Sequence, residues 1–94
     1  MTISQLADTF NLAPQEALVL AYLLEHEGYA SNAHLATAIG LDTSSSADAW
    51  RKAHTHLSVV IHRIRQKVPE GSILNRRGFG FRVDADKLFG GDLV

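Results

Sequence analysis

The side chains best suited to chemistry are the basic residues gathered in the second half of the sequence. The segment from Arg51 to Arg82 carries eight basic residues and one acidic residue, a net charge of +7, whereas the remainder carries one basic and nine acidic residues, a net charge of −8. A local basic surface attracts phosphate even when the whole chain is near neutral, and an arginine guanidinium also fits the edge of a guanine. The alternative interpretation is that these charges form ordinary solvated faces.

Most of this charge falls on one expected helix, which begins by Ala47 and ends at Pro69 because proline breaks the helical hydrogen bonding. Residues at three- and four-residue steps form a stripe that we expect to face the core: Trp50, His54, Leu57, Val60, Ile61, Ile64 and Val68. A second set of side chains lies between them, on a different face of the helix: His56, Val59, His62, Arg63 and Gln66. The sequence therefore predicts a polar, basic helix face that the core does not use.

Two further helices are expected to position this face. Pro14 suits the first turn of a helix of about twelve residues that ends at Gly28. Ser31 is a good N-cap for a short second helix, which Gly40 stops.

Strand-forming residues follow Pro69. The segments 73–76 and 79–83 flank Arg77-Gly78, which predicts a β-hairpin. Phe81 is expected to be a core aromatic residue, whereas Phe79, between two glycines, is expected to lie exposed on the hairpin. Residues 1–11 are either a short helix or an extended arm, and residues 84–94 are expected to form a short tail with frayed ends.

Length and composition limit the class of protein. A chain of 94 residues suits one domain, and the absence of cysteine removes disulfides and thiolate metal sites. The sequence has no signal-peptide pattern at its start and no run of 18 apolar residues, so we expect a cytoplasmic protein that does not use a membrane.

Four stretches of the sequence together resemble the DNA-binding effector domain of OmpR/PhoB-type bacterial response regulators. They are Leu12-Ala-Pro-Gln-Glu16, Ser31-x3-Leu35, Val60-Ile-His-Arg-Ile-Arg-Gln-Lys67 and Arg77-Gly-Phe-Gly-Phe-Arg-Val83. The resemblance covers residues 12–83, and its last motif is the most specific. It implies a mostly α fold with a small β-hairpin, namely a winged helix-turn-helix with a three-helix core and a C-terminal wing.

The resemblance also implies roles for individual residues. His56, Val59 and Arg63 match positions that face bases, while His62 and Arg65 match positions near phosphates. Arg77 matches the wing arginine that reaches the minor groove. Four neighbouring residues are expected to add mainly phosphate contacts, which strengthen binding without specifying sequence: Arg51, Lys67, Asn75 and Arg76. Arg65 and Lys67 have a second interpretation, as cations that complement the helix dipole.

The sequence departs from the family in two places. Family members carry a small sheet before the first helix and usually a phosphoacceptor receiver domain, but eleven residues precede Leu12 here, so neither fits. We therefore expect control through expression level, a partner protein or a segment outside this sequence. The segment from Thr43 to Thr55 stands where the family has a variable loop, and it either lengthens the third helix or contacts a partner.

Other chemistries have little support in the sequence. His54 and His56 are two residues apart and point away from each other on a helix, whereas a helical metal pair needs a separation of four. The serines at 44–46 lack a nucleophile-elbow context, and no Walker-type phosphate loop is present. We expect no enzyme activity, no metal and no cofactor.

Two functions remain from the sequence. The first is a sequence-specific regulator of transcription that binds double-stranded DNA, with homodimer binding recognisable as two half-sites. The second is a protein-interaction module that uses the acidic remainder, Trp50 or Phe79 to bind a transcription component such as RNA polymerase, or another regulator, since a scaffold alone does not fix function.

Overall fold

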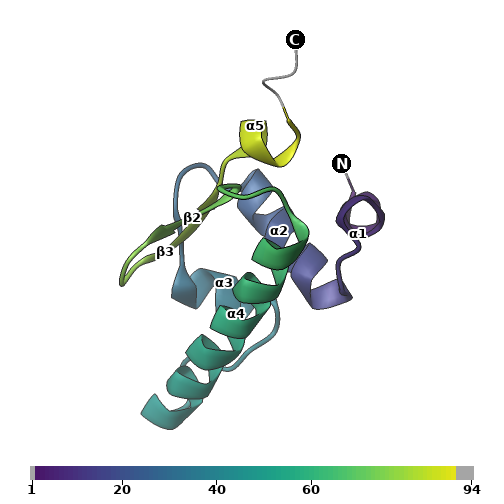
Figure 1. The fold of residues 1–94 in the computed structure, drawn as a ribbon. Helices are drawn as coiled ribbons and strands as arrows, with labels where there is room; N and C mark the ends of the chain where they lie inside the picture. Colours follow the sequence, from purple (N-terminus) through teal and green to yellow (C-terminus); the bar gives the residue numbers. More distant parts are fainter. Residues whose placement is uncertain (1, 91–94) are drawn as a thin grey trace.

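The computed structural model describes residues 2–90 as a mostly helical chain with one small antiparallel sheet (Figure 1). Five helices and three strands follow one another in this order: α1 (Ile3–Phe10), α2 (Pro14–Glu25), β1 (Ala30–Ser31), α3 (Asn32–Ala38), α4 (Ala47–Lys67), β2 (Ile73–Arg76), β3 (Gly80–Val83) and α5 (Ala85–Leu88).

Local capping residues explain where the helices begin. The Thr2 hydroxyl accepts a hydrogen bond from the Gln5 amide, and the Gln5 side chain accepts one from the Thr2 amide, so a reciprocal cap starts α1. Serine hydroxyls cap α3 and α4, with Ser31 accepting from His34 N and Ser46 accepting from Ala49 N.

The sheet has the strand order β1–β3–β2, with both pairs antiparallel. Ser31 of β1 and Arg76 of β2 both lie opposite Gly80. A side chain at Gly80 would collide with the carbonyl group of Ala30, so glycine is required for β1 to approach the hairpin this closely.

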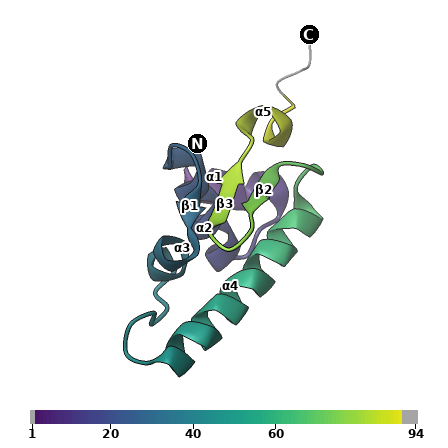
Figure 2. The ribbon, with the colours of Figure 1, turned by 90° about the vertical axis from the view of Figure 1, so that its left-hand side faces the viewer.

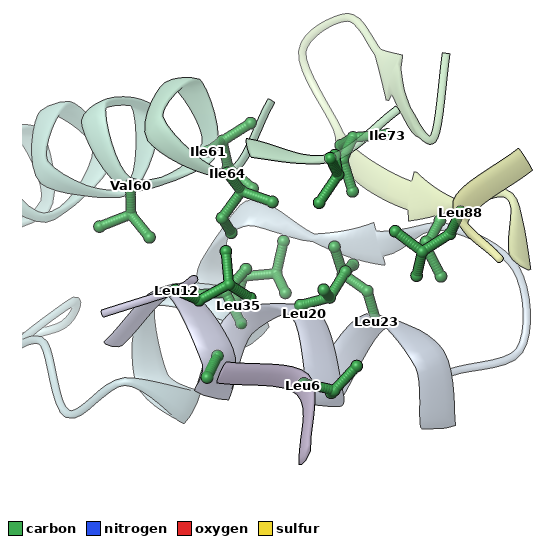
Figure 3. Packing of buried hydrophobic residues seen from close by; sticks show 14 of the residues in the cluster. Leu6, Leu12, Leu20, Leu23, Leu35, Val60, Ile61, Ile64, Ile73 and Leu88 are labelled. Atoms are coloured by element: carbon green, nitrogen blue, oxygen red, sulfur yellow. The ribbon is translucent and has the colours of Figure 1, made fainter. Parts of the chain in front are cut away.

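The core lies between α1, α2, α4 and the sheet (Figure 3). Every helix and strand contributes a buried apolar residue; examples are Leu6, Leu20, Leu35, Ile61, Ile64, Ile73 and Leu88. Residues 12–83 and both flanks thus share one core.

Several predictions differ from the structure. The helix that starts at Pro14 ends at Glu25, three residues before Gly28. His54 does not face the core but is exposed, and Trp50 is only half-buried, while Ala53 is buried in their place. The N-terminal turns of α4 extend away from the sheet and α5, so little covers them (Figures 1 and 2).

The predicted hairpin is part of a three-stranded sheet, because β1 pairs with β3. Of the two alternatives for the N-terminal segment, the structure shows a helix, α1, over Ile3–Phe10. Residues 84–90 include α5, whose Leu88 belongs to the core, so this part is not a frayed tail. Residues 91–94 of the predicted tail lie outside the described residues.

Candidate nucleic-acid interface

One exposed face of α4 gathers most of the residues predicted to contact bases. Side chains at three- and four-residue steps along the helix line one shallow hollow: Asp48, Arg51, Lys52, Thr55, His56, Val59 and Arg63. Val59 is 41% exposed although it is apolar. We call the solvent-exposed set Arg51, Thr55, His56, Val59 and Arg63 the α4 face; it presents an apolar centre between polar and cationic side chains.

His56 is held by a residue that the sequence did not indicate. Its Nε2 lies 2.7 Å from Oε1 of Gln15, in the first turn of α2. The two residues are 41 positions apart, so no spacing rule connects them. This contact joins α2 to the middle of the α4 face.

A carboxylate lies at the beginning of the α4 face. Asp48 Oδ1 is 2.9 Å from a guanidinium nitrogen of Arg51, and Asp48 Oδ2 is 3.4 Å from Nζ of Lys52. All three side chains are more than half exposed, so each pair contributes little to stability. Asp48 instead lowers the positive charge at this end of the helix. Its spacing of three and four residues before two cations was the signal available in the sequence.

Lys67, predicted to contact phosphate, forms an ion pair with the buried carboxylate of Glu16. Its Nζ donates to Oε1 of Glu16 at 2.8 Å, and the Glu16 side chain is 5% exposed. Burial alone would raise the pKa of the Glu16 carboxyl, but hydrogen bonds from Lys67 and the Ala13 amide and the charges of Lys67 and Arg63 lower it. Lys67 thus stabilises the junction of α2 with α4.

Arg65, also predicted near phosphate, binds the hairpin. Its guanidinium donates to the carbonyl of Ile73 at 3.0 Å and lies 5.6 Å from the centroid of the Phe81 ring. The half-buried Phe81 packs against the core. Arg65 therefore connects α4 with both strands of the hairpin.

His62 and Gln66 lie one helical turn apart on the exposed side of α4. Gln66 Nε2 is 3.3 Å from His62 Nε2. Neither side chain lines the hollow that contains His56 and Arg63.

The hairpin turn presents a second cluster of exposed polar residues: Asn75, Arg76 and Arg77. Gly78 adopts a φ of +78°, which favours glycine and closes the turn. The Arg76 guanidinium lies 5.6 Å from the centroid of Phe79, which is 44% exposed as expected.

The hairpin turn and the α4 face border the same hollow. Residues from α3, α4 and the turn line it: Asn32, Ala47, Trp50, Arg51, His54, Thr55 and Gly78. The Asn32 amide also donates to the Phe79 carbonyl at 2.8 Å, which connects the turn to the beginning of α3. Figure 1 shows the hairpin projecting to the left, on the side of the molecule where α3 lies.

The segment from Thr43 to Thr55 includes the start of α4 at Ala47, so much of it lengthens this helix. The Trp50 and His54 rings lie near each other at its exposed end, with centroids 5.7 Å apart and planes tilted by 59°.

Within residues 2–90, no three histidine, aspartate or glutamate side chains are grouped as a metal site would require. None of the described helices combines the length and apolar character needed to cross a membrane.

Comparison of the chain with protein-family models, with curated proteins and with solved structures gave no match.

Proposed function

We propose that this protein is a sequence-specific transcriptional regulator that binds double-stranded DNA through a winged helix-turn-helix. The observation that carries the proposal is that exposed arginines lie both on the α4 face (Arg51 and Arg63) and on the hairpin (Arg76 and Arg77). Gly78 of the hairpin turn lines the same hollow as Arg51 and Thr55, which supports it. The succession α2, β1, α3, α4, β2 and β3 with strand order β1–β3–β2 agrees with this fold, in which α3 and α4 form the helix-turn-helix and the hairpin forms the wing.

In this proposal the α4 face enters the major groove, which is about 12 Å wide and admits an α-helix. Arg63 reads a guanine by two hydrogen bonds, and the exposed Val59 packs on a thymine methyl group. Arg77 reaches the minor groove from the wing, and Arg51 and Arg76 contact phosphates. Arg65 and Lys67 serve the fold through their internal contacts and add less to DNA binding than the sequence predicted.

The first test is a selection from random duplexes followed by affinity measurements on the enriched site. Arg63→Ala should weaken binding about 5- to 150-fold if the arginine makes a good bidentate base contact in the major groove. Arg77→Ala should also weaken binding, through loss of the proposed minor-groove contact. Lys87→Ala is the matched control, because this exposed lysine lies on α5 near Asp84 and Asp86, away from the α4 face. Two enriched half-sites would indicate a homodimer on DNA.

The alternative function is a protein-interaction module, and exposed apolar side chains favour it as the second candidate. Ile3 and Leu18 are 44% and 40% exposed and line one hollow between α1 and α2. If no duplex is enriched, and regulation in cells survives both arginine substitutions, the DNA proposal is wrong and a protein partner such as RNA polymerase becomes the better candidate.

A further inference from the structure

Gln15 reaches the α4 face from a different helix. It lies in the first turn of α2, where Pro14 occupies the first position and the Glu16 carboxylate accepts from the Ala13 amide at 3.1 Å. The pair between Glu16 and Lys67 holds this turn against α4. Gln15 is therefore carried on a well-supported backbone.

The contact with Gln15 favours one of the two neutral tautomers of His56. The atom of Gln15 at 2.7 Å from His56 Nε2 is the carbonyl oxygen Oε1, which can only accept. Nε2–H must then donate, and in a neutral imidazole the other nitrogen, Nδ1, is left as an acceptor. A histidine without such a partner can exchange the two roles.

The role of Nδ1 matters because His56 lines the same hollow as Val59 and Arg63. In the major groove, adenine N6 and cytosine N4 are donors, whereas guanine N7 and O6 are acceptors. An imidazole held with Nδ1 as acceptor can accept a hydrogen bond from the amino group of adenine or cytosine, but it cannot donate one to N7 or O6 of guanine.

We propose that Gln15 is a positioning residue for base recognition: it holds His56 so that Nδ1 accepts a hydrogen bond from the amino group of adenine or cytosine. This inference rests on the proposed function, and it adds the base class read at one position and a determinant outside the recognition helix.

The test compares Gln15→Met, His56→Ala and the double variant on the selected duplex, with each base pair of the site changed in turn. Methionine has a similar length and no amide. Gln15→Met and His56→Ala should both reduce discrimination at the same adenine or cytosine, by about three- to tenfold for one hydrogen bond. In the His56→Ala background, Gln15→Met should have no further effect on that base pair.

Lys87→Ala is the control, since this exposed lysine lies on α5, near Asp84 and Asp86 and away from His56. It should leave discrimination at the His56 base pair unchanged. Thermal unfolding of Gln15→Met should stay close to that of wild type, which separates positioning from a general loss of structure.

The state of the ring can be measured without DNA. Imidazole nitrogen spectra should show His56 with its proton on Nε2 in wild type and a mixture of tautomers in Gln15→Met. Unchanged spectra would overturn the inference, as would base discrimination that Gln15→Met leaves intact or alters equally without His56. If wild type selects no duplex at all, the proposed function fails as well, whatever the spectra show.

Discussion

At the scale of single residues, several cations that look alike in the sequence have different surroundings in the structure. Lys67 binds the buried Glu16, Arg65 binds the hairpin, and Arg63 and Arg77 stay exposed. The sequence could not separate these cases, because the partners of Lys67 and Arg65 come from other elements. Burial of a carboxylate makes the first of these contacts the most informative to test.

The Glu16 pair should make stability depend on pH. The folded-state pKa of Glu16 is lowered from its ordinary value of 4.5, so its stabilisation is fully present above that value and is lost as the pH falls through the folded-state pKa. Glu16→Gln should lower the free energy of unfolding near neutral pH by about 1.5 kcal/mol.

Thermal or urea unfolding across the acid range would measure this effect. The difference between wild type and Glu16→Gln should shrink as the solution is acidified. Glu25→Gln, an exposed residue of the same helix, is the control and should change stability little at any pH. A Glu16→Gln deficit that stays constant down to strongly acidic pH would contradict the ion-pair account.

At the scale of elements, the structure differs most from the sequence prediction where an element forms by pairing with residues far away in the sequence. The strand β1 has two residues, too few for any periodicity, and exists because it pairs with β3 about fifty positions later. The stripe on α4 was predicted correctly from Leu57 onward but fails at His54, because the periodicity of a helix does not tell where its neighbours end. In contrast, the reciprocal cap of α1 has a signal in the sequence, a threonine at position 2 followed three residues later by Gln5, and this pattern favours a helix over an extended arm.

Gly80 gives an element-scale prediction. In Gly80→Ala the new methyl group meets the backbone of Ala30 and Ser31, which cannot move aside as a side chain would. The free energy of unfolding should fall by about 2–3 kcal/mol, within the range for overpacked sites. Circular dichroism during thermal unfolding would measure the loss.

Gly28→Ala is the matched control for this substitution. Gly28 has a φ of +77° and open space around it, so alanine there costs only the backbone strain, about 1–2 kcal/mol. If the two variants unfold alike, the close approach of β1 to Gly80 is not a significant constraint.

At the scale of the whole molecule, the main feature is the separation of positive from negative charge along the sequence. Residues 51–82 carry +7 and the rest −8, and one acidic residue of the rest, Asp48, lines the same hollow as the α4 face. The total charge of −1 is therefore a poor guide to affinity for a polyanion such as DNA, because a polyanion is attracted by the local electrostatic field at the surface it approaches.

Under the proposed function, this charge distribution predicts that the affinity for DNA falls strongly as salt concentration rises, and that a single substitution can change the slope. If wild type neutralises about four phosphates, the logarithm of its affinity should fall with the logarithm of salt concentration with a slope of about −3.6. Asp48→Asn releases Arg51 and Lys52 from their partner and should make the slope steeper by about one.

Titrations of both proteins on specific and random duplexes would measure the two slopes. The gain in affinity for Asp48→Asn should appear on both duplexes alike, because phosphate contacts carry no sequence information. A gain confined to the specific duplex would show instead that Asp48 opposes one particular base.

The attachment of the hairpin turn to the start of α3, through Phe79 and Asn32 and through Gly80 and Ser31, has a consequence for the DNA. Under the proposed function, this attachment would fix the distance between the parts of the protein that contact the two grooves. Because these contacts tie the hairpin to α3, we expect a duplex lengthened by one base pair between the two grooves to bend or untwist when it binds. Under the proposed function, tolerance for spacing should therefore follow the flexibility of the intervening base steps.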